Sequence, residues 1–136
     1  MSISQLGGLL CREDMVLLLD DDETFRTALS ELLSDDGHAV KAYGSIAEMP
    51  PLSDLPTPSA LITDYQLGRG EDGLEFARRF NTVHPDVPII LVTAYASDHV
   101  THSAAAMPYL SLLRKPMPYE DLQRLLDPAR DPGPAS

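Results

Sequence analysis

The chain has 136 residues, of which 43% are hydrophobic and 23% are charged, as in an ordinary folded domain. This length suffices for one domain with its own core, without disulfides or a structural metal. The net charge of −11 argues against a nucleic-acid or anionic-membrane surface, because phosphates attract lysine and arginine. The single cysteine, Cys11, cannot form an internal disulfide, and no apolar run approaches the roughly 20 residues of a membrane helix. We therefore expect a cytoplasmic protein without nucleic-acid or membrane partners.

The expected domain occupies residues 14–128. Residues 1–13 include a pair of glycines, so we expect them to form an N-terminal arm. Residues 129–136 are rich in proline and glycine, and we expect a flexible C-terminal tail there. Between these ends, short apolar runs alternate with segments of helical periodicity.

Five short apolar runs predict β-strands. In chain order they are residues 15–19, 39–43, 60–64, 89–92 and 109–114. The first run has five consecutive apolar residues without alternation, which is typical of a strand buried on both faces. The second and third runs are separated by a proline-rich stretch, where we expect only a short helix around 45–49 and then an irregular link.

Helical spacing of apolar residues predicts the other elements. The clearest stripe begins at Phe25 and consists of Phe25, Ala28, Leu29, Leu32 and Leu33. Asp22 is the expected N-cap of this helix, and Gly37 is its expected stop. Further helices are expected over 71–82, 97–106 and from Tyr119 to the end of the domain. The alternation predicts an α/β fold with an open, doubly wound parallel sheet and helices on both faces.

Polar residues stand at the C-terminal ends of four of the predicted strands. Asp20 and Asp21 follow the first, Asp64 ends the third, and Thr93 and Lys115 follow the fourth and fifth. In a doubly wound sheet these ends can meet at one edge, where ligands bind. Three carboxylates at one point repel one another, which favours a bound cation such as Mg²⁺. An aspartate can also attack phosphorus, with a lysine and a hydroxyl to stabilise the phosphoryl oxygens.

With these residues the chain resembles the receiver domain of two-component response regulators, over about residues 14–128. Five segments support the resemblance: 16–22, 61–64, 72–75, 91–94 and 113–116. Each segment is a weak signal alone, but all five occur in the expected order. The separations of 43, 29 and 22 residues between Asp21, Asp64, Thr93 and Lys115 also agree with that family. The resemblance implies a flavodoxin-like (βα)5 fold with strand order 2-1-3-4-5, here with a shortened second helix.

The resemblance also implies roles for individual residues. Asp64 is expected to accept phosphate from a histidine kinase or phosphotransfer domain, with Thr93 as the switch hydroxyl and Lys115 as the partner of the phosphate. The expected Mg²⁺ ligands are Asp20, acting mainly through water, Asp21, Asp64 and the backbone carbonyl of Gln66. Lys115-Pro116 is expected to be a cis peptide. Gln66 and Tyr95 occupy positions that tune phosphate lifetime in this family.

The expected function is that of a signalling receiver, not of an enzyme that turns over an external substrate. It catalyses its own phosphorylation and slow dephosphorylation, and it switches a protein-interaction surface near its fourth helix and fifth strand. The resemblance leaves open whether the chain stands alone or belongs to a hybrid kinase, and whether it forms a dimer.

Two departures from the family pattern concern the surroundings of the site. Leu112 occupies the position, three residues before the lysine, where the family usually has an aromatic side chain that moves inward on activation. The link after Asp64 is one residue longer than usual and rich in glycine, which favours a mobile loop.

Two alternative functions use the same residues differently. A pseudo-receiver would dock onto partners without phosphorylation, although the complete set of acids, threonine and lysine argues against it. A small Mg²⁺-dependent phosphatase with an aspartate nucleophile would normally need a second aspartate two residues after Asp64, but that position is Gln66.

Overall fold

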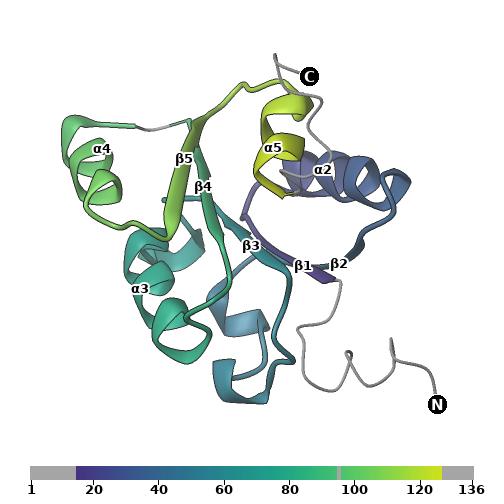
Figure 1. Cartoon of the computed structure of the whole chain (residues 1–136), viewed down its shortest axis with the longest axis horizontal. Helices are drawn as coiled ribbons and strands as arrows, with labels where there is room; N and C mark the ends of the chain where they lie inside the picture. Colours follow the sequence, from purple (N-terminus) through teal and green to yellow (C-terminus); the bar gives the residue numbers. More distant parts are fainter. Residues whose placement is uncertain (1–14, 95, 127–136) are drawn as a thin grey trace.

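The computed structural model describes residues 15–94 and 96–126, which form one α/β domain (Figure 1). The expected arm, tail and Tyr95 lie outside the described residues. The strands are β1 (Met15–Leu19), β2 (Ala39–Tyr43), β3 (Ala60–Thr63), β4 (Ile89–Thr93) and β5 (Leu110–Arg114). The helices are α2 (Glu23–Asp35), α3 (Gly73–Val83), α4 (Asp98–Ala105) and α5 (Tyr119–Leu126). None of these helices is long and apolar enough to cross a membrane.

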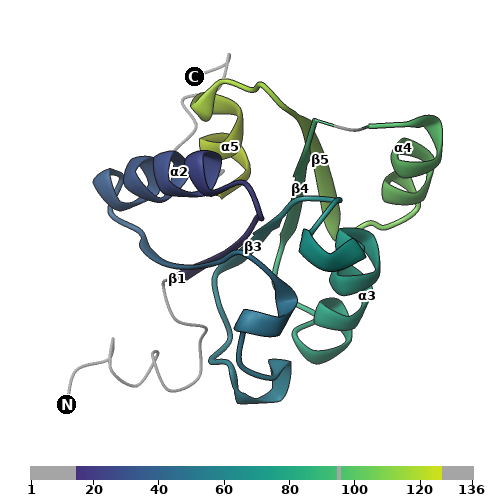
Figure 2. The ribbon, with the colours of Figure 1, turned by 180° about the vertical axis from the view of Figure 1, so that it is seen from behind.

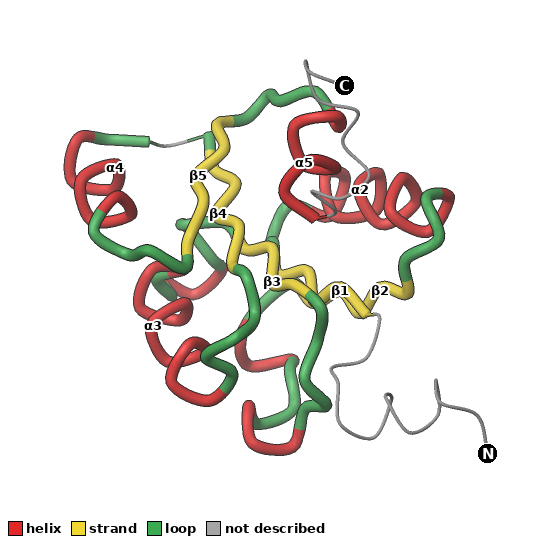
Figure 3. The backbone as a smooth tube through the Cα atoms, in the orientation of Figure 1, coloured by secondary structure: helices red, strands yellow, loops and turns green. Residues whose placement is uncertain are grey.

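The five strands form a single parallel sheet in the order β2-β1-β3-β4-β5. Figure 3 shows the strands side by side across the middle of the molecule, with helices on both faces. Helices α2 and α5 cover one face, and α3 lies on the opposite face, as the reverse view in Figure 2 also shows. The expected doubly wound fold and its strand order are therefore confirmed.

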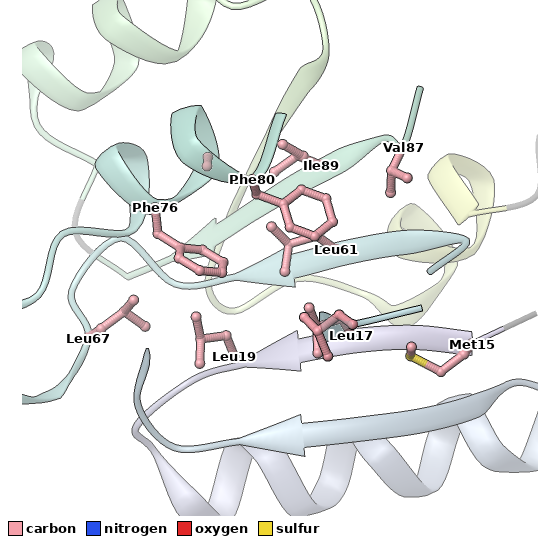
Figure 4. Packing of buried hydrophobic residues seen from close by; sticks show 11 residues of the cluster. Met15, Leu17, Leu19, Leu61, Leu67, Phe76, Phe80, Val87 and Ile89 are labelled. Carbon is pink, nitrogen blue, oxygen red and sulfur yellow. The ribbon is translucent and has the colours of Figure 1, made fainter. Parts of the chain in front are cut away.

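Alternation along each strand divides the core between the two faces. On β1, Met15, Leu17 and Leu19 pack toward α3, whereas Val16 and Leu18 pack toward α2 and α5. The α3 face is shown in Figure 4, where Phe76 and Phe80 point toward the leucines of β1 and β3. Because both faces are covered, β1, β3 and β4 are buried along their whole length, as expected for the central strands of a parallel sheet.

Helix α2 begins and ends where the sequence predicts, but its buried stripe is narrower. The Asp22 side chain caps the helix by accepting a hydrogen bond from the Phe25 amide at 3.2 Å. Leu29 and Leu33 are buried, whereas Leu32 is 44% exposed. The prediction that Leu32, like Ala28, belongs to the core stripe was therefore wrong. These two residues lie beside the row formed by positions 25, 29 and 33, which alone faces the sheet.

The segment between β2 and β3 differs from the expectation. It holds two 3-10 turns, η1 (Ile46–Glu48) and η2 (Leu52–Asp54), where one short helix and an irregular link were expected. Pro50 lacks an amide hydrogen, so the first turn cannot continue, and Pro51 begins the second. Buried Leu55 and half-buried Met49 and Leu52 then cover the α3 side of the core in place of a full helix.

The link after Asp64 folds into a turn, and the mobility expected from its glycines stays a prediction. It contains η3 (Gly68–Gly70) and is closed by an antiparallel bridge between Gln66 and Asp72. Asp72 caps α3 by accepting hydrogen bonds from the amides of Leu74 and Glu75, so the helix begins at Gly73, two residues later than predicted. Leu67 is buried beneath the turn and anchors it.

Candidate functional site

Strand register brings the acidic residues together. Leu19 of β1 pairs with Thr63 of β3, so Asp20 and Asp64 leave the sheet side by side at its C-terminal edge. The Asp64 amide donates to the Leu19 carbonyl at 3.1 Å, which extends the pairing by one residue. The carboxylates of Asp20, Asp21 and Asp64 lie within 4.8 Å of one another. The sequence prediction that these three acids meet is therefore borne out geometrically.

The same register argument places Lys115 beside them. Thr93 at the end of β4 pairs with Arg114 of β5, and the Lys115 amide donates to the Thr93 carbonyl at 2.9 Å. The Lys115 ammonium donates to Asp20 Oδ2 at 2.9 Å and to Asp64 Oδ2 at 3.1 Å. The Lys115-Pro116 peptide is cis, as expected. Thr93 is buried at the strand end, at the edge that holds the acids.

The three acids differ in their exposure to water. Asp20 is 1% exposed and Asp64 is 9% exposed, whereas Asp21 is open to solvent. Burial raises the pKa of Asp20, and the repulsion from Asp64 adds to this, against the opposing effects of Lys115 and of the Asp22 amide. A nearby cation stabilises the charged form of such a buried carboxylate.

Lys115 supplies such a cation. Burial alone would lower the pKa of its ammonium, but the hydrogen bond and charge of Asp20, together with Asp64, outweigh burial and raise the pKa. The ammonium therefore stays charged at neutral pH. The Lys115 ammonium contacts two of the three acids in this cluster, and the excess of acidic groups over this ammonium favours the binding of a divalent cation.

The donor set fits a hard divalent cation. All three side chains offer carboxylate oxygens, the ligand type that Mg²⁺ and Ca²⁺ prefer. Exposed Asp21 leaves one side open to water, which Mg²⁺ retains when it binds proteins. Gln66 lies in the adjacent turn, and its backbone amide donates to Asp64 Oδ1 at 3.3 Å. The proposed roles of its carbonyl and of the Thr93 hydroxyl stay predictions.

The backbone around Asp64 is fixed by Gly73. The Gly73 amide donates to the Tyr65 carbonyl at 2.7 Å, and a Cβ atom at Gly73 would overlap the Asp64 carbonyl oxygen. Only glycine allows the start of α3 to approach the phosphoacceptor candidate so closely. This close approach is a physical reason for a glycine directly after the Asp72 cap. In the sequence, Gly73 was only one residue of the segment 72–75 that supports the family resemblance.

Two further residues touch the site and were not predicted to do so. Arg26 Nη1 donates to the Asp20 carbonyl oxygen at 2.7 Å and so fixes the end of β1 from helix α2. The Lys115 ammonium lies 4.0 Å from the centroid of the Phe25 ring. Phe25 was assigned only to the core stripe, because a helical apolar position gives no sign of a cation in contact with its ring.

Leu112 lies on the opposite side of β4 and β5 from α5. It is half-buried and packs with the cluster formed by Leu74, Leu91, Val100, Ala104 and Met107, which joins α4 to the sheet. The position where the family usually has a mobile aromatic is therefore occupied by an aliphatic contact to α4. Tyr95, the other residue predicted to tune the site, lies outside the described residues.

Comparisons with known proteins agree with this geometry. The family model described as "Response regulator receiver domain" matches residues 16–127. The chain is 30% identical over 112 residues to the cyclic di-GMP phosphodiesterase response regulator RpfG of Xanthomonas campestris, covering 79% of this chain and 29% of that one. It is 28% identical over 112 residues to the DNA-binding transcriptional regulator NtrC of Klebsiella pneumoniae, covering 82% and 24%. The chain thus spans less than a third of these curated relatives.

Two solved structures extend the comparison. A Burkholderia pseudomallei response regulator with a phosphorylated aspartic acid, calcium ion and citrate matches with a TM-score of 0.75 and 26% identity, over 84% of this chain and 66% of that one. A CheY-like receiver domain protein from Methanospirillum hungatei matches with a TM-score of 0.75 over 88% and 98%, and at 20% identity it supports the fold alone.

Proposed function

The chain belongs to the response regulator receiver domain family, and on this basis we propose that Asp64 accepts a phosphoryl group from the phosphohistidine of a histidine kinase or phosphotransfer domain. The observation that supports this most directly is the contact of the Lys115 ammonium with both Asp20 and Asp64 inside a cluster of three carboxylates. Receiver domains of this family are in general regulatory rather than enzymatic, and the match to the phosphodiesterase response regulator RpfG covers only 29% of that protein.

The proposed step is a displacement at phosphorus. A carboxylate oxygen of Asp64 forms a bond to phosphorus while the bond from phosphorus to the donor's imidazole nitrogen breaks. The imidazole keeps the electron pair of that bond and takes a proton from solvent. Lys115, which already donates to Asp64, donates to a phosphoryl oxygen after transfer, and the Thr93 hydroxyl turns toward another.

The residues around Asp64 are proposed to accommodate the negative charge of the phosphoryl group. Asp20, Asp21, Asp64 and the Gln66 carbonyl are the proposed ligands of Mg²⁺, which when bound neutralises charge on the phosphoryl oxygens. Arg26 and the Asp22 amide hold Asp20 in place, through its carbonyl and its carboxylate respectively. Gly73 holds the Asp64 backbone against the start of α3. A phosphorylated aspartate with a calcium ion in the Burkholderia relative supports this assignment.

The proposed output is a change in a protein-binding surface formed by α4 and β5. β5 is one of the two edge strands of the sheet, and Leu112 links it to α4 through a shared apolar cluster. Phosphorylation is proposed to bias a two-state equilibrium of this region. The partner, dimerisation and cytoplasmic location stay predictions.

The test is Mg²⁺-dependent labelling by a small phosphodonor. Incubation with acetyl phosphate and Mg²⁺ is expected to add one phosphoryl group, seen by intact mass, which is absent in Asp64→Asn. Asp54→Asn is the matched control, because Asp54 is an exposed aspartate in η2, outside the carboxylate cluster.

Four results would contradict the proposal or a part of it. Labelling that persists in Asp64→Asn would exclude Asp64 as the acceptor. Labelling of the wild-type chain without Mg²⁺ would exclude the proposed dependence on the metal. Absence of labelling with retained binding to partners would favour the pseudo-receiver. Continuous turnover of phosphate esters would favour the phosphatase.

A further inference from the structure

Lys115 has a third neighbour besides the two carboxylates. An ammonium has three N–H donors, and here Asp20 Oδ2 and Asp64 Oδ2 accept from it at 2.9 and 3.1 Å. The face of the Phe25 ring lies beside the same nitrogen, with its centroid 4.0 Å away. This is well within the roughly 6 Å over which a cation is attracted to the negative face of an aromatic ring.

The position of the ring is fixed by the loop that holds the acids. Asp22 N donates to Asp20 Oδ1 at 2.9 Å, and the Asp22 carboxylate accepts from the Phe25 amide at 3.2 Å. These hydrogen bonds join the loop of acids to the first turn of α2, and the first turn of α2 in turn determines the position of the Phe25 ring. On its other side, Phe25 packs against the buried cluster that includes Leu18 and Leu29.

We propose that Phe25 is a positioning residue for phosphoryl transfer, which holds the Lys115 ammonium through a cation–π contact. This inference rests on the proposed function and adds a residue to it. A lysine side chain is a flexible stem with a point charge, so two hydrogen bonds alone leave it freedom to turn. The ring restricts that freedom from a third direction. It thereby keeps the ammonium where a phosphoryl oxygen on Asp64 needs it, before the reaction begins.

A purely structural role for Phe25 makes a different prediction. If the ring served only to fill space in the α2–α5 core, any change that preserves its shape would leave phosphorylation unchanged. If the ring acts through the negative potential of its face, the phosphorylation rate is expected to fall as electron density is withdrawn from the ring at constant shape. Fluorinated phenylalanines separate these two roles, because fluorine withdraws electron density with little change in volume.

The first experiment places phenylalanine with one, two or three ring fluorines at position 25 of the full chain. The initial rate of labelling by acetyl phosphate with Mg²⁺ is expected to fall stepwise, by about 3- to 10-fold for the trifluorinated ring. Phe25→Leu is expected to reduce the rate at least as much. The same fluorinated residues at Phe80 are the matched control, because that ring is buried on the other face of the sheet. They are expected to leave the rate unchanged.

The second experiment tests the contact without any phosphorylation. The chain has only two lysines, Lys41 and Lys115, and Lys41 is exposed on β2. Lysine labelled at its ε-methylene group therefore gives two NMR signals. Protons above a ring face are shielded, so the Lys115 signal is expected upfield of the Lys41 signal, and the difference is expected to disappear in Phe25→Leu.

The outcomes separate this inference from the proposed function. A wild-type protein that is labelled at a rate independent of fluorination at position 25 would overturn the role of Phe25 and leave Asp64 as acceptor. An unshifted Lys115 signal would overturn the contact itself. A wild-type protein that is never labelled would refute the proposed function, and the role of Phe25 in transfer with it, whatever the NMR signal shows.

Discussion

Replacement of Lys115 by methionine tests how the acidic centre is held together. Methionine keeps an apolar stem of similar length but removes the charge. The change leaves Asp20 and Asp64 without the ammonium that lies 2.9 and 3.1 Å from them. It also removes the cation beside the Phe25 ring. We expect Lys115→Met to lower the free energy of unfolding in the absence of divalent cations.

The expected size follows from the burial of the three partners. At an effective dielectric constant near 20, two unit charges about 3 Å apart attract by about 5 kcal/mol, and withdrawal of both charges from water offsets most of this. Removal of one partner of a buried pair costs about 3–5 kcal/mol, because the other charge stays buried and unpaired. The side chains of Lys115 and Asp64 are 14% and 12% exposed, so water relieves part of the cost. We therefore expect a loss of about 3 kcal/mol.

The measurement is urea unfolding followed by circular dichroism at neutral pH with a chelator. Lys41→Met is the matched control, because Lys41 is the other lysine and its side chain is exposed. We expect that control to change stability by less than about 0.5 kcal/mol. A loss below about 1 kcal/mol for Lys115→Met would refute the view that this ammonium offsets the repulsion among the carboxylates.

Three further predictions concern the acids and the glycine of the site. Burial raises the pKa of Asp20 above its usual 3.8, so the charged form of this side chain opposes folding, and the contribution of Asp20 to wild-type stability falls as pH rises from about 3.8 through the raised value. Asp20→Asn is therefore expected to gain stability relative to wild type as pH rises through this window, in urea unfolding with a chelator; a pH-independent difference would contradict this. Mg²⁺ at 100 times its dissociation constant is expected to raise the wild-type free energy of unfolding by about 2.7 kcal/mol. Asp21→Asn is expected to lose most of this gain, whereas Asp98→Asn, at an exposed position, is expected to keep it. Equal gains in all three proteins would exclude Asp21 as a ligand. Gly73→Ala is expected to lower the free energy of unfolding by about 3 kcal/mol, because the new Cβ would overlap the Asp64 carbonyl oxygen. Gly70→Ala is expected to lower it by only about 1–2 kcal/mol, because the φ of 72° at this position is unfavourable for alanine. Equal losses in thermal unfolding would contradict the close approach of Gly73 to Asp64.

The sequence was sufficient to predict the layout of the fold. Uniformly apolar runs such as 15–19 are typical of central strands of a covered sheet, and helical spacing between them predicts the crossovers. Predictions failed where local pattern and burial diverge. Leu32 continues the apolar spacing of α2 but faces solvent, because only one row of that helix meets the sheet. The prolines between β2 and β3 predicted a broken helix but not a second 3-10 turn, whose apolar residues are held by the core.

At the site, the sequence by itself determined the identity and order of the acids, the threonine and the lysine, because each directly follows or ends an apolar strand. Only the tertiary structure decided how they meet. The pairing of Leu19 with Thr63 and of Thr93 with Arg114 turns separations of many residues into contacts of about 3 Å, and no local pattern encodes such a register. The contact of Phe25 with Lys115 was also decided by the tertiary structure. The sequence predicts that Phe25 is apolar and faces inward, but the cation beside its ring comes from the other end of the chain.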